Sequence, residues 1–347
     1  MQMRTGTPMR RQPDGCLRFC GIQERAAERA DMEQKKTKLK NPRIVALLAF
    51  FSCALWGSAF SAVKTGYALF GIRTDAWADQ LTFGGIRFAL AGIMALAFGS
   101  IRAKKLLVPN RRSMKKICII SLFQTVLQYF CYYIGLAHTT GVKASVLVGM
   151  NVFTAILIAS LLLRIEKLTA RSIIGCTVGF LGIILINLDG LTGGLRFQLI
   201  GDGLILLCTV ASGFSSAFMK KLSGGEDPVL LSGWQFLLGG IVLAVIGLLG
   251  GGQIGTCTVP AVSVLLYLAF VSAAAYSVWA MLLKYNPVSK VAVYGFMNPV
   301  CGVVISAIVL HESGVLSVSF LIALVLVCAG IIIVNRCPQA KVPSADS

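Results

Sequence analysis

Ten apolar runs follow one another from residue 44 to residue 335, separated by short polar connections. Each run holds roughly 17 to 24 residues, which is enough for an α-helix to cross a bilayer. The composition agrees, because 56% of the residues are hydrophobic, 13% are charged and the mean hydropathy is +0.80. The sequence therefore predicts an all-α membrane protein with ten transmembrane helices, near residues 44–65, 79–99, 117–137, 142–163, 172–188, 201–219, 229–250, 261–283, 290–310 and 317–335.

Lysine and arginine are distributed unevenly over the connections between these runs. If the N-terminus is cytoplasmic, 27 of the 32 basic residues fall in the two tails and the even-numbered connections. The opposite side keeps Lys64, Arg73, Lys143 and Arg196, and Arg87 lies inside the second run. This bias predicts a multi-pass protein of the plasma membrane with both termini in the cytoplasm. It also accounts for the net charge of +18 without a nucleic-acid partner.

The two ends of the chain differ from the rest in composition. Residues 1–42 are polar, basic and unpatterned, and we expect them to form a disordered tail. Met32 begins a short basic lead before the first run, so residues 1–31 are either an upstream extension or a natural tail. Residues 336–347 are expected to form a cytoplasmic tail. Cys16 and Cys20 have no second pair of ligands beside them, and we expect neither a metal nor a cofactor.

The second half of the chain repeats the first. Arg87-Phe88 matches Gln235-Phe236, Tyr129-x-x-Tyr132 matches Tyr276-x-x-Trp279, and Met150-Asn151 matches Met297-Asn298, at offsets of 147 or 148 residues. Each half has five apolar runs, and an odd number of crossings makes the second half enter the membrane from the opposite side. The sequence therefore predicts two inverted five-helix repeats, residues 43–188 and 199–335, as in alternating-access carriers.

The ninth run, from Lys290 to Glu312, contains a proline in its interior. Pro299 removes a backbone donor and clashes with the preceding turn, so a helix here should loosen or kink. Lipid offers no partner for a freed carbonyl, and such a break is tolerated only against protein or a wet cavity. We therefore predict a helix break at Pro299, beside Asn298.

Polar and aromatic side chains within the runs are candidates for a substrate site. A guanidinium at mid-membrane costs at least about 2.5 kcal/mol, so Arg87 should face either a substrate carboxylate or backbone carbonyls. Buried amides can line a cavity or bridge helices, and aromatic rings can form its wall or only pack. Glu166 and Glu312, at the ends of two runs, are expected to be structural caps or gate contacts. The candidate binding residues are Trp56, Arg87, Gln124, Gln128, Tyr132, Asn151, Gln235, Tyr276, Trp279 and Asn298.

These motifs resemble the drug/metabolite transporter superfamily, in its ten-helix EamA-type branch. The likeness rests on Leu55–Phe60 with Lys64, on Arg87-Phe88, on Leu163–Leu168, and on Asn298-Pro299 with His311-Glu312, and it covers roughly residues 44–335. The resemblance implies bundles of five helices around a central cavity that passes small organic solutes. The proline usual in the fourth helix is absent, with Val152 or Phe153 in its place, so a matching break in the first half is not implied.

The expected function is a secondary transporter of small metabolites or amino-acid-like solutes, with export as the expected direction. An intramembrane lipid-modifying enzyme and a non-catalytic receptor or scaffold remain alternatives. The enzyme is disfavoured because His138 and His311 have no carboxylate cluster beside them. No carboxylate lies at the centre of a run, which favours exchange or facilitated movement over proton coupling through a mid-membrane acid. The expected partners are a small-molecule substrate and the lipid bilayer, and a homodimer is left open.

Overall fold

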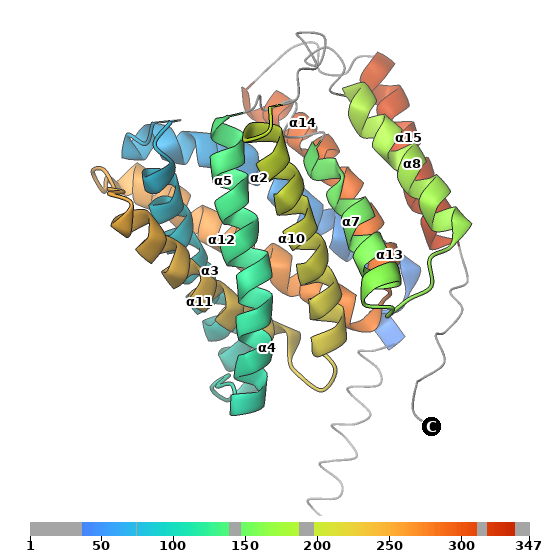
Figure 1. Ribbon diagram of the computed structural model, residues 1–347, viewed down its shortest axis with the longest axis horizontal. Helices are drawn as coiled ribbons and strands as arrows, with labels where there is room; N and C mark the ends of the chain where they lie inside the picture. Colours follow the sequence, from blue (N-terminus) through green and yellow to red (C-terminus); the bar gives the residue numbers. More distant parts are fainter. Residues whose placement is uncertain (1–36, 74, 139–146, 187–197, 311–317, 337–347) are drawn as a thin grey trace, which may run out of the picture.

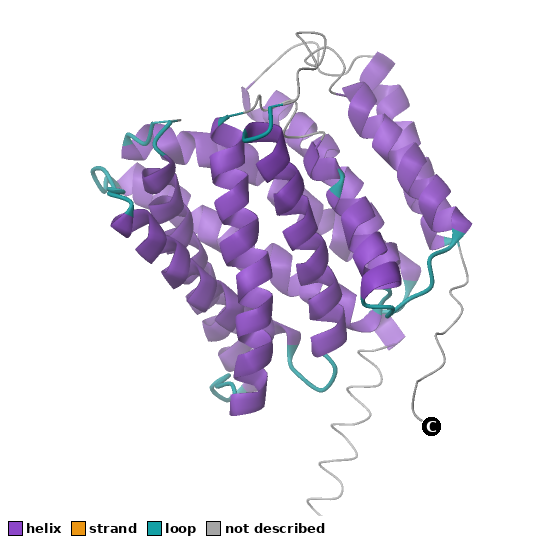
Figure 2. Cartoon of the chain, viewed as in Figure 1, coloured by secondary structure: helices purple, strands orange, loops and turns teal. Residues whose placement is uncertain are grey.

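The computed structural model describes residues 37–73, 75–138, 147–186, 198–310 and 318–336. Within these ranges the chain is helical and contains no strand, as Figure 2 shows. The predictions made for most of the N-terminal tail, the C-terminal tail beyond residue 336, Lys143, Arg196, His311 and Glu312 lie outside the described residues.

The helices follow the ten apolar runs in order. Those of the first half are α2 (Pro42–Phe70), α3 (Trp77–Ala103), α4 (Arg111–Ser121), α5 (Gln128–Ala137), α7 (Asn151–Leu157) and α8 (Ala170–Ile186). Those of the second half are α10 (Gly201–Leu222), α11 (Pro228–Leu249), α12 (Val259–Tyr285), α13 (Val288–Ala292), α14 (Met297–Leu310) and α15 (Val318–Asn335).

Six helices in the described ranges are long and apolar enough to cross a membrane. They are α2, α3, the continuous helix Arg111–Leu136, α10, α11 and α12. Shorter apolar helices cover Leu147–Leu162, Ala170–Leu185 and Leu321–Asn335. The expected all-α class is confirmed for the described residues, whereas the number of crossings and the side of the termini remain predictions.

Local sequence explains where the long helices start and stop. Asn41 accepts a hydrogen bond from the Arg43 amide at 3.0 Å, and Pro42 occupies the first helical position of α2, where no donor is lost. Gly71 follows the last residue of the helix as its C-cap, and its φ of 67° is left-handed and favours glycine. Asp227 and Pro228 begin α11 in the same way, with the Asp227 carboxylate 2.7 Å from the Val229 amide.

Helices from the two halves pack against one another reciprocally. In Figure 1, α3 lies beside α11 and α8 lies beside α15. Helix α2 packs on α12 and α14, and its counterpart α10 packs on α5 and α7, which are the first-half counterparts of those helices. Exchanging the halves thus maps these helix pairs onto one another.

Close approaches of glycines show the same reciprocity at the level of single residues. A Cβ added at Gly85 would lie 2.7 Å from the Gly240 carbonyl oxygen, and one added at Gly92 would lie 2.6 Å from the Gly233 carbonyl oxygen. Gly85 and Gly233 are 148 residues apart, as are Gly92 and Gly240. Small residues at such a crossing let two backbones touch, which is how helices associate where lipid removes the hydrophobic driving force.

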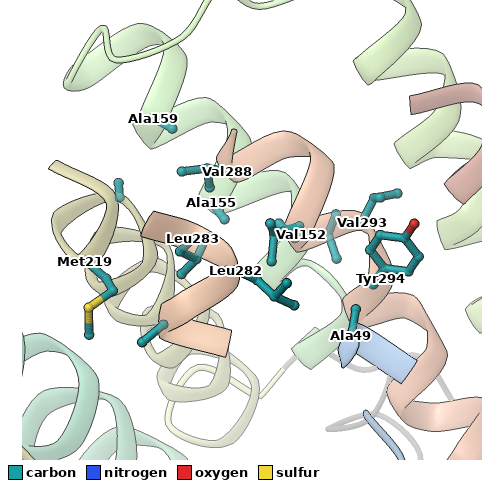
Figure 3. Packing of buried hydrophobic residues seen from close by; sticks show 14 of the residues in the cluster. Ala49, Val152, Ala155, Ala159, Met219, Leu282, Leu283, Val288, Val293 and Tyr294 are labelled. Atoms are coloured by element: carbon teal, nitrogen blue, oxygen red, sulfur yellow. The ribbon is translucent and has the colours of Figure 1, made fainter. Parts of the chain in front are cut away.

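The largest apolar core joins α7 of the first half to α12 and α13 of the second. Figure 3 shows Val288 close to Ala155 and Ala159, and Val152 close to Val293, and these side chains are buried. The interface between the halves is therefore a packed one in this conformation, at the end of the molecule where α13 begins.

Two kinds of irregular helix distinguish the halves. The first half contains two π-helical segments, η1 (Leu122–Leu127) and η2 (Ile158–Leu162), whereas the second contains a 3₁₀ segment, η3 (Val293–Phe296). Pro299 lies in the first turn of α14, directly after η3, where its missing amide is tolerated. The first half is also interrupted, at a turn on Met150 that bonds to the Leu147 carbonyl at 2.9 Å. The break at this position therefore does not require a proline.

Candidate functional site

Arg87 lies near the middle of α3 with only 5% of its surface exposed. Its Nη2 donates to the Ser272 hydroxyl at 3.0 Å and its Nε to the Leu268 carbonyl oxygen at 3.4 Å, both on α12. It also interacts with the Tyr133 hydroxyl. Among the described residues, no carboxylate lies within ion-pair distance of the guanidinium. The side chain is thus held in place by neutral groups while its charge stays uncompensated.

Gln235 on α11 occupies the equivalent position of the second half. Its Oε1 accepts a hydrogen bond from the Thr125 hydroxyl at 2.7 Å, and Thr125 is the counterpart of Ser272. The Ser121 hydroxyl donates to the Gln235 carbonyl oxygen at 3.0 Å. The amide Nε2 of Gln235 is buried and has no partner. Both halves therefore build the same slot between two helices, but only the first fills it with a charge.

Aromatic residues from both halves meet beside Arg87. The Tyr129 and Tyr276 hydroxyls, which are counterparts in the repeat, are 2.6 Å apart. Tyr276 lies edge-on to Trp56, with ring centroids 4.9 Å apart, and Trp56 lies edge-on to Trp279 at 5.0 Å. The Tyr132 ring lies edge-on to the Tyr129 ring, with centroids 6.3 Å apart. We call these five residues, Trp56, Tyr129, Tyr132, Tyr276 and Trp279, the aromatic cluster.

The stack of Phe88 on Phe236 is a second meeting of counterparts. Their ring centroids are 5.4 Å apart and the two rings are within 9° of parallel. The Phe88 ring centroid also lies 4.2 Å from that of Tyr129. The Arg87 guanidinium lies 5.1 Å from the Phe88 ring centroid, a cation–π distance. Arg87 also acts electrostatically on Tyr129, Tyr132 and Tyr276. The predicted site residues Trp56, Arg87, Tyr132, Tyr276 and Trp279 therefore lie together, and Gln128 at the start of α5 interacts with Tyr276.

Other predicted site residues lie apart from this cluster. The Gln124 Oε1 accepts from the Ser215 hydroxyl of α10 at 2.8 Å, so this amide bridges helices. Asn151 is the first residue of α7 and Asn298 the second residue of α14, and each has a buried Oδ1 without a partner. In the described ranges, these three amides make no hydrogen bond or ring contact with the aromatic cluster.

Two buried polar atoms beside Arg87 and the aromatic cluster have no hydrogen-bond partner, namely Trp56 Nε1 and the Tyr67 hydroxyl of α2. Gln235 Nε2, in the equivalent slot of the second half, is unpaired as well. An unpaired buried polar atom costs about 1–3 kcal/mol, so a group of them indicates a place where a ligand supplies the missing partner. Our sequence reasoning missed Tyr67. Tyr67 follows Trp56 by eleven residues, which is about three helical turns, so both lie on one face of α2. This spacing could have indicated from the sequence that Tyr67 lies on the same side as Trp56.

The described ranges hold no group of three His, Cys, Asp or Glu side chains that could bind a metal ion. The chemistry available around Arg87 is thus one cation, neutral donors and aromatic faces. Such a set suits recognition of a small organic molecule with a negatively charged group.

Comparison with known proteins places the chain among membrane transporters. The uncharacterized transporter YvbV of Bacillus subtilis (strain 168) is 27% identical over 307 residues, spanning 86% of this chain and 94% of that protein. The uncharacterized inner membrane transporter YedA of Escherichia coli (strain K12) is 25% identical over 270 residues, spanning 76% of this chain and 81% of that protein. A crystal structure that is 16% identical shares the fold, with a TM-score of 0.69 over 83% of this chain and 95% of that one.

The EamA-like transporter family matches the chain twice in succession, over residues 43–188 and 199–336. The resemblance drawn from the sequence motifs is therefore confirmed. This protein belongs to the EamA-like transporter family.

Proposed function

We propose that the protein is a secondary transporter that exports small organic solutes, amino-acid-like ones among them, by alternating access. In this proposal ten helices cross the plasma membrane as two inverted repeats, with both termini in the cytoplasm. The reciprocal packing of α3 on α11 and of α8 on α15 supports inverted repeats, because each pair consists of counterparts. The solute binds between the halves, at Arg87 and the aromatic cluster.

The observation that carries the proposal is the uncompensated charge of Arg87. A buried guanidinium with no carboxylate nearby destabilises the protein when no solute is bound, and the carboxylate of a solute would neutralise the charge. The unpaired Trp56 Nε1 and Tyr67 hydroxyl would complete the hydrogen bonds of the solute. The aromatic cluster would cover its apolar part.

The test is transport by the purified full-length protein in liposomes, against a panel of small carboxylates, zwitterions and neutral metabolites. Solutes should be taken up with saturation and exchange with a preloaded unlabelled solute. Carboxylates and zwitterions should be preferred over neutral analogues of the same size. Chemical alteration of the recovered solute would indicate an enzyme instead, and no movement of any solute would contradict the proposal.

A further inference from the structure

Glu166 is a buried acid where the two halves meet at the basic face. By basic face we mean the end of the helix bundle, at the bottom of Figure 1, where α4 and α13 begin and where α10 and α12 end. Glu166 follows η2 in the loop before α8 and is 8% exposed. Its two carboxylate oxygens lie 3.0 and 3.4 Å from the backbone nitrogen of Ser289. The hydrogen bond therefore ties the first half to α13 of the second.

The charged groups around Glu166 do not neutralise it. Lys220 at the end of α10 attracts the carboxylate, yet its ammonium donates to the Lys284 carbonyl oxygen at 3.1 Å. Lys284 of α12 in turn donates to the Glu226 carbonyl oxygen at 2.6 Å. The remaining basic groups nearby in the chain or the fold are Arg164 and Lys167 on the same loop, Lys290 on α13 and Lys40 before α2. Among the described residues, none forms an ion pair with Glu166.

A second acid at the basic face, Glu226, shows how an ion pair changes the pKa of a partly buried carboxyl group. Glu226, in the loop after α10, lies 2.9 Å from the Lys116 ammonium. Its partial burial opposes ionisation, but Lys116 and neighbouring groups outweigh this and hold its pKa below the usual value. At Glu166, burial outweighs the Ser289 amide and Lys220, and it raises the pKa to about 7.

Beneath the Glu166–Ser289 contact the interface is apolar. Val288, next to Ser289, is buried against Ala155 and Ala159 of the first half, as Figure 3 shows. Opening the basic face between these elements would separate this packing and admit water to Glu166. The carboxylate is thus placed where its solvation changes with the conformation of the carrier.

We propose that Glu166 is a proton-binding site that controls closure of the basic face. This inference rests on the proposed alternating-access function. When the loop and α13 are together, burial favours the protonated acid, which still accepts a hydrogen bond from the Ser289 amide. When they separate, water solvates the carboxylate and its pKa returns toward the ordinary value of about 4.3.

The sign of the effect follows from linkage. The closed arrangement has the higher pKa, so it binds the proton more tightly, and low pH favours closure. Raising the pH from 6 to 8 ionises Glu166 and shifts the equilibrium toward opening, by about tenfold for a pKa near 7 in the closed form. The basic face would therefore open more readily in an alkaline cytoplasm.

The experiment is hydrogen exchange of the purified full-length protein in detergent at pH 6 and pH 8, corrected for the intrinsic pH dependence of exchange. Peptides covering α13 should be about tenfold more protected at pH 6 than at pH 8. Glu166→Gln, which imitates the protonated acid, should be protected at both values. Glu226→Gln is the matched control and should follow the parent. An unchanged α13 in the parent, or a pH response that persists in Glu166→Gln, would overturn the proposal.

A second variant keeps the test open if Glu166→Gln does not fold. Lys220→Gln retains a donor for the Lys284 carbonyl but removes the attraction to Glu166, so the midpoint of the α13 transition should move to higher pH. A midpoint that stays in place would count against the proposal. Because exchange needs no solute, a pH-sensitive α13 in a protein that transports nothing would refute the proposed function and leave the proton site standing.

Discussion

The two halves build the same contact around Arg87 and Gln235, and they differ there in a single charge. Arg87 of α3 donates to Ser272 of α12, and Gln235 of α11 accepts from Thr125 of η1. Ser272 and Thr125 are 147 residues apart, and Arg87 and Gln235 are 148 apart. The fold therefore explains why a long polar side chain stands at each position. It does not explain why one of them is an arginine, and that difference points to the solute.

Other differences between the halves concern helix geometry. The π-helical segments η1 and η2 occur only in the first half of the described chain, and the interior proline of the ninth run only in the second. Such irregular turns are common at functional sites, because they redirect side chains and free backbone groups. The halves thus share the packing of these helix pairs, while their irregular helical turns differ.

The largest effect should come from breaking the packing that the halves share. Gly240→Leu places a side chain against the Gly85 carbonyl and the α3 backbone, where no flexible neighbour can yield. We expect a loss of more than about 3 kcal/mol, because overpacking against backbone forces the helices apart. Size-exclusion profiles and thermal unfolding measure this. Gly224→Ala, in open space, is the control, and equal stability of both variants would refute the close crossing.

The next effect concerns Glu166, whose second-half counterpart Glu312 lies outside the described residues. Its raised pKa means that stability from this group is full at low pH and is lost as the pH rises toward about 7. Glu166→Gln removes the buried charge, so it should be more stable than the parent at pH 8, by at most about 3–4 kcal/mol. At pH 4 the two should unfold at nearly the same temperature. A variant less stable than the parent at pH 8 would show that the ionised form is favoured here.

A smaller effect is expected where the halves touch through Tyr129 and Tyr276. Tyr276→Phe leaves the buried Tyr129 hydroxyl without its partner and should cost about 1–2 kcal/mol, whereas Tyr129→Phe should cost less, because the Tyr276 hydroxyl still interacts with Gln128. The double variant should cost less than the sum of the two, because no orphaned hydroxyl remains. Thermal unfolding of all four proteins gives the coupling. Strict additivity would mean that the two hydroxyls do not interact.

The smallest effect should be at the ion pair of Lys116 and Glu226, which has no role in the comparison of the halves. Both side chains are partly exposed, and such pairs contribute only about 0.2–1 kcal/mol. Glu226→Gln should lower the unfolding temperature slightly, and added salt should remove the difference. A large loss that salt does not affect would indicate a structural role for this loop.

Much of this architecture could be read from the sequence, because hydrophobic length and internal repetition are local signals. The run predicted at 79–99 corresponds to α3, Trp77–Ala103, and the repeat offset of 147 pairs Tyr129 with Tyr276, whose hydroxyls are in contact in the structure. The partner of Arg87 could not be read, since Ser272 is 185 residues away and nothing local indicates the contact. The burial of Glu166 was hidden for the same reason, because α13 creates it.

The roles of the buried amides and the turn at Met150 could be determined only from the structure. Gln124 looked like Gln128 in the sequence, but it bridges to Ser215, whereas Gln128 reaches Tyr276. The interruption at Met150 was not implied, because the proline usual there is missing.

The most direct test of the difference between the halves is solute binding by Arg87→Gln, which makes the two slots alike. The dissociation constant of a transported carboxylate is measured by calorimetry on the purified protein. The parent protein is the reference, and Gln124→Leu, which removes an amide that bridges helices, is the control. Arg87→Gln should remain monodisperse and bind roughly ten- to a hundredfold more weakly, the loss of one charge-assisted pair of about 1.5–3 kcal/mol. Arg87→Lys should recover only part of the affinity, since an ammonium lacks the planar fork. Unchanged affinity in a well-folded Arg87→Gln would show that the arginine only joins α3 to α12, and would contradict the account.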